Sequence, residues 1–128
     1  MASFQADVEI DVRKVDGVTC VLDINGELTA FAEDRLMGAY NDGCGAPVQN
    51  VILNFERLEY MSSSGIGLLV TLLIRAQRQR QRLLASGLSD HYRHIFQLTR
   101  LDEAISLYPS VDEAVAAVGA LTTPARGR

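Results

Sequence analysis

The chain has 128 residues, of which 48% are apolar, and it carries a formal net charge of −4. This length suits one domain that buries roughly two-thirds of its unfolded surface, and the acidic balance argues against a general nucleic-acid binder, because that binding depends mainly on positive charge. The longest apolar run, residues 65–74, is too short for a bilayer span of about 20 residues. Because the first residues also lack an export signal, we expect a cytoplasmic protein without direct membrane insertion.

The first third of the chain predicts two strands and a helix. Residues 6–15 and 17–26 have the pattern of strands, and an Asp-Gly turn signal lies between them, so we expect an antiparallel pair. Residues 29–43 carry apolar side chains at close to helical spacing and end in an Asn-Asp-Gly stop signal. A helix is therefore expected after the strand pair.

The remaining segments alternate in type. Residues 48–55 form an apolar, β-branched run typical of a central parallel strand, and residues 63–81 predict one long helix. Further along we expect a strand at 82–87, a helix at 88–101 capped by Ser89, an edge strand at 104–109, and a helix at 110–121 capped by Ser110.

This alternation of strands and helices is typical of an α/β fold. We expect a mixed, mainly parallel sheet that begins with the antiparallel pair and packs with about four helices. Residues 1–121 are expected to form the single domain, and residues 122–128 a flexible tail.

The two cysteines, Cys20 and Cys44, have neither Cys-x-x-Cys spacing nor a histidine near them in sequence. This argues against a zinc site or a redox pair. Cys20 falls on an apolar alternation and is expected to be buried and inert. Cys44 lies in a Gly-Cys-Gly turn, where nothing nearby in sequence indicates a lowered thiol pKa.

Three consecutive serines, Ser62 to Ser64, open the long predicted helix. A serine hydrolase would need a base nearby and usually a Gly-x-Ser-x-Gly turn, which is missing. His91 and His94 lie off the apolar stripe of their own helix, so we expect them to be solvated, and no third residue completes a metal site with them. The lysine of a phosphate-binding loop is also missing. The sequence therefore predicts no enzyme, no metal site and no cofactor.

Because the three serines lie at the start of a predicted helix, their hydroxyls can cap the helix or carry a phosphate. Ser62 can cap the helix by accepting a hydrogen bond from a backbone N–H, which contributes roughly 1 kcal/mol. A serine in the first turn is also well placed to carry a phosphate, because free N–H groups and the helix dipole favour negative charge there. The fold would accept such a modification, and only the surface would change.

The stretch "VILNFERLEYMSSSGIGLLV" resembles the core motif of the STAS family of anti-sigma factor antagonists. "INGELTAFAEDRL" is similar to the family's Gly-Glu-Leu-Asp segment and first helix, and "IFQLTRLDEAISLYPSVDEAVAA" to its C-terminal portion. The resemblance covers nearly the whole chain and implies a single STAS-like domain.

The resemblance also implies a partner-switching role in transcription regulation. Family members bind an anti-sigma serine kinase of the GHKL type when unmodified, are released by phosphorylation, and are reset by a metal-dependent serine phosphatase. The phosphorylated serine falls on Ser63 and the family's second serine on Ser64. Ser62 and Thr29 stand where the family has aspartates, and we expect both to cap their helices. The alternative is a STAS-like accessory subunit of a membrane transporter, which contacts an ATPase without phosphorylation.

Helical geometry predicts which side of residues 63–81 meets a partner. If Ile66, Leu69, Val70, Leu73 and Ile74 face the sheet, the opposite side is exposed. The residues expected to bind the partner are Gly65, Gly67, Leu68, Thr71, Leu72 and Arg75. The basic run from Arg75 to Arg82 is interpreted as a solvated helix C-terminus, so we expect no nucleic-acid partner.

Overall fold

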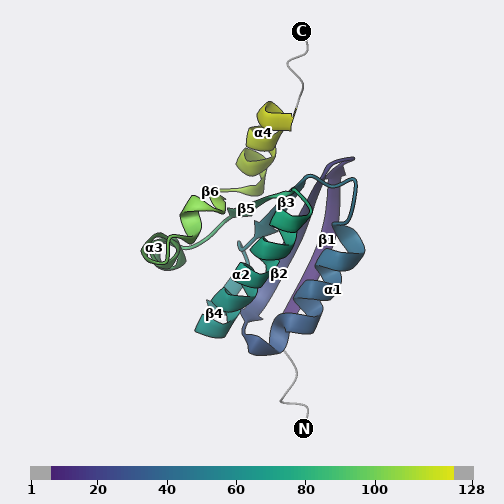
Figure 1. The fold of residues 1–128 in the computed structure, drawn as a ribbon. Coiled ribbons are helices and arrows are strands. Elements are labelled where there is room, and N and C mark those ends of the chain that lie inside the picture. The colour runs from purple at the N-terminus through teal and green to yellow at the C-terminus, as the bar shows by residue number, and fades with distance from the viewer. Residues whose placement is uncertain (1–6, 123–128) are drawn as a thin grey trace.

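The computed structural model describes residues 7–122, with the side chains of residues 7–119, and contains one six-stranded sheet (Figure 1). The strands are β1 (Val8–Asp16), β2 (Thr19–Leu28), β3 (Asn50–Asn54), β4 (Leu58–Met61), β5 (Arg82–Ser86) and β6 (Ser106–Tyr108). The helices are η1 (Ala30–Ala32), α1 (Glu33–Gly43), α2 (Ser63–Arg78), α3 (Asp90–Leu98), η2 (Leu101–Glu103) and α4 (Val111–Thr122), where η marks a 3-10 helix.

The sheet is mixed, as predicted. Its order is β1-β2-β3-β5-β6, with β1 antiparallel to β2 and the other pairs parallel. Strand β4 was not predicted; it has four residues and pairs with the end of β2 beyond the part that β3 covers. Because β4 leads directly into α2, it fixes where that helix begins.

The two faces of the sheet are covered unequally. Helices α1 and α2 lie in front of the sheet in Figure 1 and enclose the main core together with Phe96 of α3. On the other face, Ala114 and Val118 of α4 pack over Val21, Ile52 and Leu84. The described part of the predicted last helix is therefore a separate layer, and Ser110 caps it by accepting from the Glu113 N–H (3.2 Å). The predicted tail lies outside the described residues except for Thr122.

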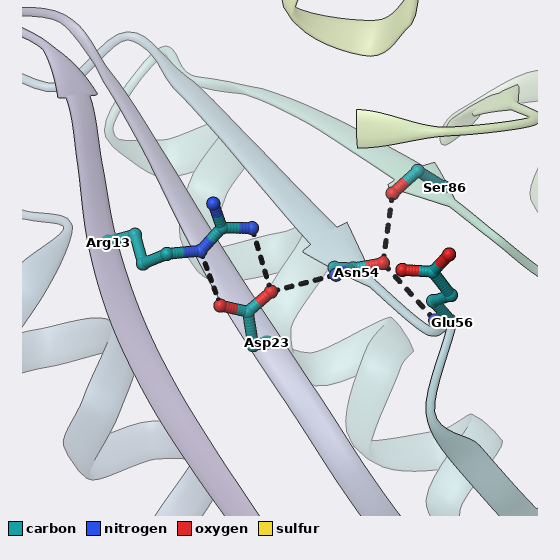
Figure 2. A network of polar contacts seen from close by, with 5 residues as sticks. All are labelled: Arg13, Asp23, Asn54, Glu56 and Ser86. Atoms are coloured by element: carbon teal, nitrogen blue, oxygen red, sulfur yellow. Dashed lines mark hydrogen bonds and ion pairs between the residues drawn. The ribbon is translucent and has the colours of Figure 1, made fainter. Parts of the chain in front are cut away.

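A polar network crosses four strands on the face that carries α4 (Figure 2). Arg13 donates to both oxygens of Asp23 (Nε 2.5 Å and Nη2 3.0 Å), Asn54 donates to Asp23 (2.8 Å), and Ser86 donates to Asn54 (3.4 Å). Burial alone would raise the pKa of Asp23, but these hydrogen bonds and the charge of Arg13 outweigh it, so its pKa lies below the ordinary value. The network holds β1, β2, β3 and β5 in register.

Cys20 is fully buried, as expected, but it forms a disulfide with Cys44, which is also fully buried, and the sequence analysis did not predict this bond. Spacing rules detect cysteines that are close in sequence, whereas this bond joins β2 to the C-terminal end of α1 across 24 residues. Buried Gln81 reinforces the same corner. Its amide donates to the Cys44 and Val48 carbonyls (2.6 and 3.0 Å), and it accepts from the Tyr40 hydroxyl (2.6 Å), whose pKa is raised by burial.

Candidate docking site at the start of helix α2

Ser62 joins β4 to α2 and caps the helix, as predicted. Its backbone is extended, its N–H donates to the Leu28 carbonyl (3.0 Å), and its Oγ accepts from the Gly65 N–H (3.0 Å). The first bond continues the pairing of β4 with β2, and the second satisfies a backbone donor that a helix start otherwise leaves free. The first turn is thus anchored to the end of β2.

Gly65 allows the helix to approach β2 closely. A Cβ at this position would lie 2.1 Å from the Leu28 carbonyl oxygen and 2.8 Å from its carbon, and both are backbone atoms that cannot move aside easily. Gly65 is buried, so its assignment to the partner-binding surface is wrong. Its role is to seat α2 against the sheet.

The predicted orientation of α2 is wrong for Leu68 and Leu72, whereas Leu69 is fully buried in the main core as expected. Leu68 and Leu72 are 8% and 0% exposed and belong to the main core, whereas Val70 and Ile74 are 37% and 44% exposed. Helix α2 is apolar on most of its circumference, so periodicity alone did not distinguish two rotations. The contact of Gly65 with Leu28 decides between them, because it directs the side of the helix that contains Gly65, Leu68 and Leu72 toward the sheet.

The opposite side of α2 forms what we call the docking face, defined by Ser63, Gly67, Val70 and Ile74. These residues are spaced by four, three and four positions, which places them in one row along a helix. All four are exposed. A Cβ at Gly67 would have nothing within 4 Å, so no packing within the described residues requires a glycine there.

The other predicted partner-binding residues flank this row. Thr71 is half-buried and its hydroxyl donates to the Gly67 carbonyl (3.2 Å), while Arg75 is exposed in the last turn. Thr29 caps η1 rather than α1, because its Oγ1 accepts from the Phe31 N–H (3.3 Å). η1 packs against α2 and presents Phe31, whose side chain is 66% exposed.

Ser63 and Ser64 lie at a positively polarised helix end. Both are exposed, the first turn of α2 contains no acidic residue, and Arg75 and Arg78 lie in its last turn. Within residues 7–122 neither serine hydroxyl has a hydrogen-bond partner. A negative charge here would be stabilised by the helix dipole and by the free N–H groups of the first turn.

The two histidines are the residues that the sequence offered as a possible base or metal ligand. His91 and His94 are exposed on α3, and no group of three His, Cys, Asp or Glu side chains among residues 7–119 is placed to hold a metal ion. No helix within the described range has the length and apolar content needed to cross a bilayer.

Sequence reasoning missed Val70 and Ile74 as exposed residues, and it missed the exposed Phe31. The signal that could have found the first two is the order of the capping residues. Once Ser62 is taken as the cap, Gly65 is the third residue of the helix, where a close approach to the end of β2 is possible only without a side chain.

Comparison with known proteins agrees with this architecture. A family model described as "STAS domain" matches residues 9–114. SpoIIAA from Bacillus, an anti-sigma factor antagonist, matches in its unphosphorylated form with 25% identity and a TM-score of 0.63, over 86% of this chain and 97% of that one. Its phosphorylated form matches with 26% identity and a TM-score of 0.64, over 86% and 99%.

Two structures with lower sequence identity to this chain share the fold. An anti-sigma factor antagonist from Mycobacterium paratuberculosis is 21% identical with a TM-score of 0.72, over 89% of this chain and 97% of that one. A sulfate transporter family protein from Wolinella succinogenes is 24% identical with a TM-score of 0.74, over 87% and 93%. Because the family model spans most of the sheet and its helices, the chain belongs to the STAS domain family.

Proposed function

We propose that this protein is an anti-sigma factor antagonist that works by partner switching. In the unmodified state the docking face of α2 binds a GHKL-type anti-sigma serine kinase. Phosphorylation of Ser63 by that kinase breaks the complex, and a metal-dependent serine phosphatase restores the unmodified state. The observation that carries the proposal is the position of Ser63, exposed at the head of the docking face in a first turn without acidic residues.

The chemistry of a phosphate explains how such a switch would act. The group adds a charge of about −1.5 to −2, which α2 tolerates because the charge lies at the positive end of its dipole. A partner surface packed on Ser63 would instead have to desolvate that charge or oppose it with its own. A hundredfold loss of affinity requires only about 2.7 kcal/mol. The fold is retained while the complex is lost.

The docking face also suits a partner that packs closely on α2. Val70 and Ile74 supply apolar contact area, and Gly67 leaves the helix backbone open directly beside Ser63. A glycine in an exposed helix costs about 1 kcal/mol relative to alanine. Since nothing within the described fold uses that glycine, its benefit is expected in the complex.

The test is direct binding to the GHKL-type serine kinases of the source organism, each purified and measured by calorimetry. Ser63→Ala should bind and resist ATP-dependent release, whereas Ser63→Asp should bind about 100-fold more weakly. Ser64→Ala is the matched control and should behave like the native protein. Mass spectrometry of the chain after incubation with kinase and ATP should locate the phosphate on Ser63.

Variants of the apolar residues test the surface itself. Val70→Glu and Ile74→Glu should weaken kinase binding without changing the unfolding midpoint. Leu98→Glu is the control, since Leu98 is an exposed apolar residue on α3, away from the docking face.

Two outcomes would contradict the proposal. A phosphate on Ser62 or Ser64 would show that the phosphorylated position has been assigned wrongly. If no phosphate forms and Ser63→Asp binds normally, the function of a transporter accessory subunit takes precedence. Recovery of a transporter ATPase, rather than a kinase, from native lysate would identify that case.

A further inference from the structure

Within residues 7–122, strand β1 forms one edge of the sheet and has β2 as its one neighbouring strand. In an antiparallel pair, successive residues direct both backbone groups alternately toward and away from the neighbouring strand. The Asp7 carbonyl accepts from the Glu27 N–H of β2 (2.9 Å), whereas the Val8 carbonyl accepts from the side chain of Arg35 on α1. The even-numbered residues from Val8 to Lys14 therefore direct their backbone groups away from β2, and the register shifts only after Lys14.

Three of these residues, Ile10, Val12 and Lys14, have no hydrogen-bond partner for their outward backbone groups within residues 7–122. Helix α1 does not close over them. A groove of about 550 Å³ runs between β1 and α1, lined by residues 9–12 of the strand and by Arg35, Ala39 and Asp42 of the helix. An edge of this kind is a template for a further strand.

The charges on β1 specify what that strand would be. Glu9 and Asp11 lie in its first half, Arg13 and Lys14 lie in its second half, and Asp16 ends the strand beyond the register shift that follows Lys14. Charged side chains usually protect an edge from pairing. Here their separation by sign makes the strand complementary to a copy of itself that runs in the opposite direction, because each acidic half then faces a basic half.

The register of such a pair follows from the same residues. A two-fold axis must pair side chains of the same sheet face, so it passes through a residue and not between residues. An axis at Asp11 opposes two aspartates, and an axis at Arg13 opposes two arginines. An axis at Val12 instead places Asp11 opposite Arg13 twice and pairs the free backbone groups of Val12 with each other.

Arg13 retains the donors that this arrangement needs. Its Nε and Nη2 bind Asp23 of the same chain, and its Nη1 has no partner in the described structure (Figure 2). A guanidinium has five N–H donors and can therefore bind a second carboxylate. Asp11 is exposed and has no ion-pair partner among the described residues, so it can supply that carboxylate from the second copy.

We propose that two copies of this chain associate through antiparallel β1 strands centred on Val12, which joins the two sheets into one. This interface uses the sheet edge and not α2, so it is independent of Ser63 and of any kinase. The strand pairing is held by the outward backbone groups of Ile10, Val12 and Lys14, and its register is fixed by the two Asp11–Arg13 pairs.

Sedimentation velocity of the full chain, from low micromolar to near-millimolar concentration, tests the proposal. The native protein should show a monomer–dimer equilibrium. Asp11→Arg should raise the dissociation constant by about tenfold or more, because position 11 of each copy would then place a positive charge opposite Arg13 of the other copy. Glu9→Arg is the matched control. It makes the same charge change on the same strand face, but in this register Glu9 lies opposite Val15, so the constant should change by no more than about twofold.

Complementation gives a sharper test of the register. Arg13→Glu alone should also fail to dimerise, because position 13 of each copy would then place a negative charge opposite Asp11 of the other copy. An equal mixture of Asp11→Arg and Arg13→Glu should form heterodimers, since both cross-strand pairs then have opposite charges. In the native protein, the amide resonances of Ile10 and Val12 should shift with concentration. Circular dichroism must show that each variant is folded.

A native chain that stays monomeric over the whole range would overturn the proposal and leave the edge to a strand from a different protein. A dimer that Asp11→Arg does not weaken would also overturn it. Equal losses in Glu9→Arg and Asp11→Arg, or failure of the folded mixture to associate, would overturn the register.

Discussion

Gly65 and Gly67 lie two residues apart on α2, yet the structure uses them in opposite ways. The backbone at Gly65 is in contact with Leu28 of the sheet, and any side chain would collide with that backbone. Gly67 faces open space on the docking face. The comparison shows that a glycine pair in one motif can serve two purposes. One glycine positions the helix, and the other keeps its outer surface flat.

The largest expected effect comes from adding a methyl group on the inner side. Gly65→Ala places a Cβ against backbone atoms of Leu28, so α2 must shift away from the sheet. We expect a loss of about 3 kcal/mol or more in the free energy of unfolding, measured by urea denaturation. A loss below about 1 kcal/mol would mean that α2 can move without consequence and that the contact does not set its orientation.

The next comparison uses two apolar residues of similar size on the two sides of α2. Leu72→Ala should cost roughly 3 kcal/mol, because Leu72 is fully buried in the main core. Ile74→Ala should cost less than about 0.5 kcal/mol, because Ile74 faces solvent. Both values come from the same denaturation experiment. Equal losses would show that the orientation of the helix described above is wrong.

The serines provide a smaller contrast at the same helix end. Ser62→Ala removes the acceptor for the Gly65 N–H and should lower the free energy of unfolding by about 1 kcal/mol. Ser63→Ala removes a hydroxyl without a partner in the described structure and should leave stability nearly unchanged. Thermal unfolding of both variants would detect the difference. A larger loss for Ser63→Ala would make Ser63 a structural residue.

The smallest expected effect has the opposite sign. Gly67→Ala should stabilise the protein by up to about 1 kcal/mol, because alanine is the better helix former and its Cβ meets nothing. The same variant should bind the kinase more weakly if the partner packs on the bare backbone. Unchanged affinity in calorimetry would remove Gly67 from the docking face while leaving its effect on stability intact.

Much of the fold could be predicted because local signals and the apolar pattern agreed. Turn signals marked the antiparallel pair, and Ser62, Ser89 and Ser110 marked helix starts that the structure confirms. Strand β4 could not be predicted in this way. It has only four residues, and its stability comes from pairing with the end of β2, which is distant in sequence.

The sequence predicted Ser62 as the cap of α2, but it did not predict which side of that helix faces the sheet. The apolar residues of α2 fit two rotations about equally well, so local pattern could not separate Leu68 and Leu72 from Val70 and Ile74. The disulfide was missed for a related reason, since Cys20 and Cys44 meet only after α1 has packed on the sheet. Both errors concern tertiary contacts, which periodicity and spacing do not encode.

The separate layer formed by α4 has a consequence for how the molecule opens. Ala114 and Val118 are its buried contacts among the described side chains, and they rest on a small apolar strip of the sheet formed by Val21, Ile52 and Leu84. Releasing α4 would leave the main core intact, so it should require much less free energy than global unfolding. We therefore expect limited proteolysis to cut first between β6 and α4. Transient exposure of that strip, more than complete unfolding, would then be the main route by which the protein aggregates.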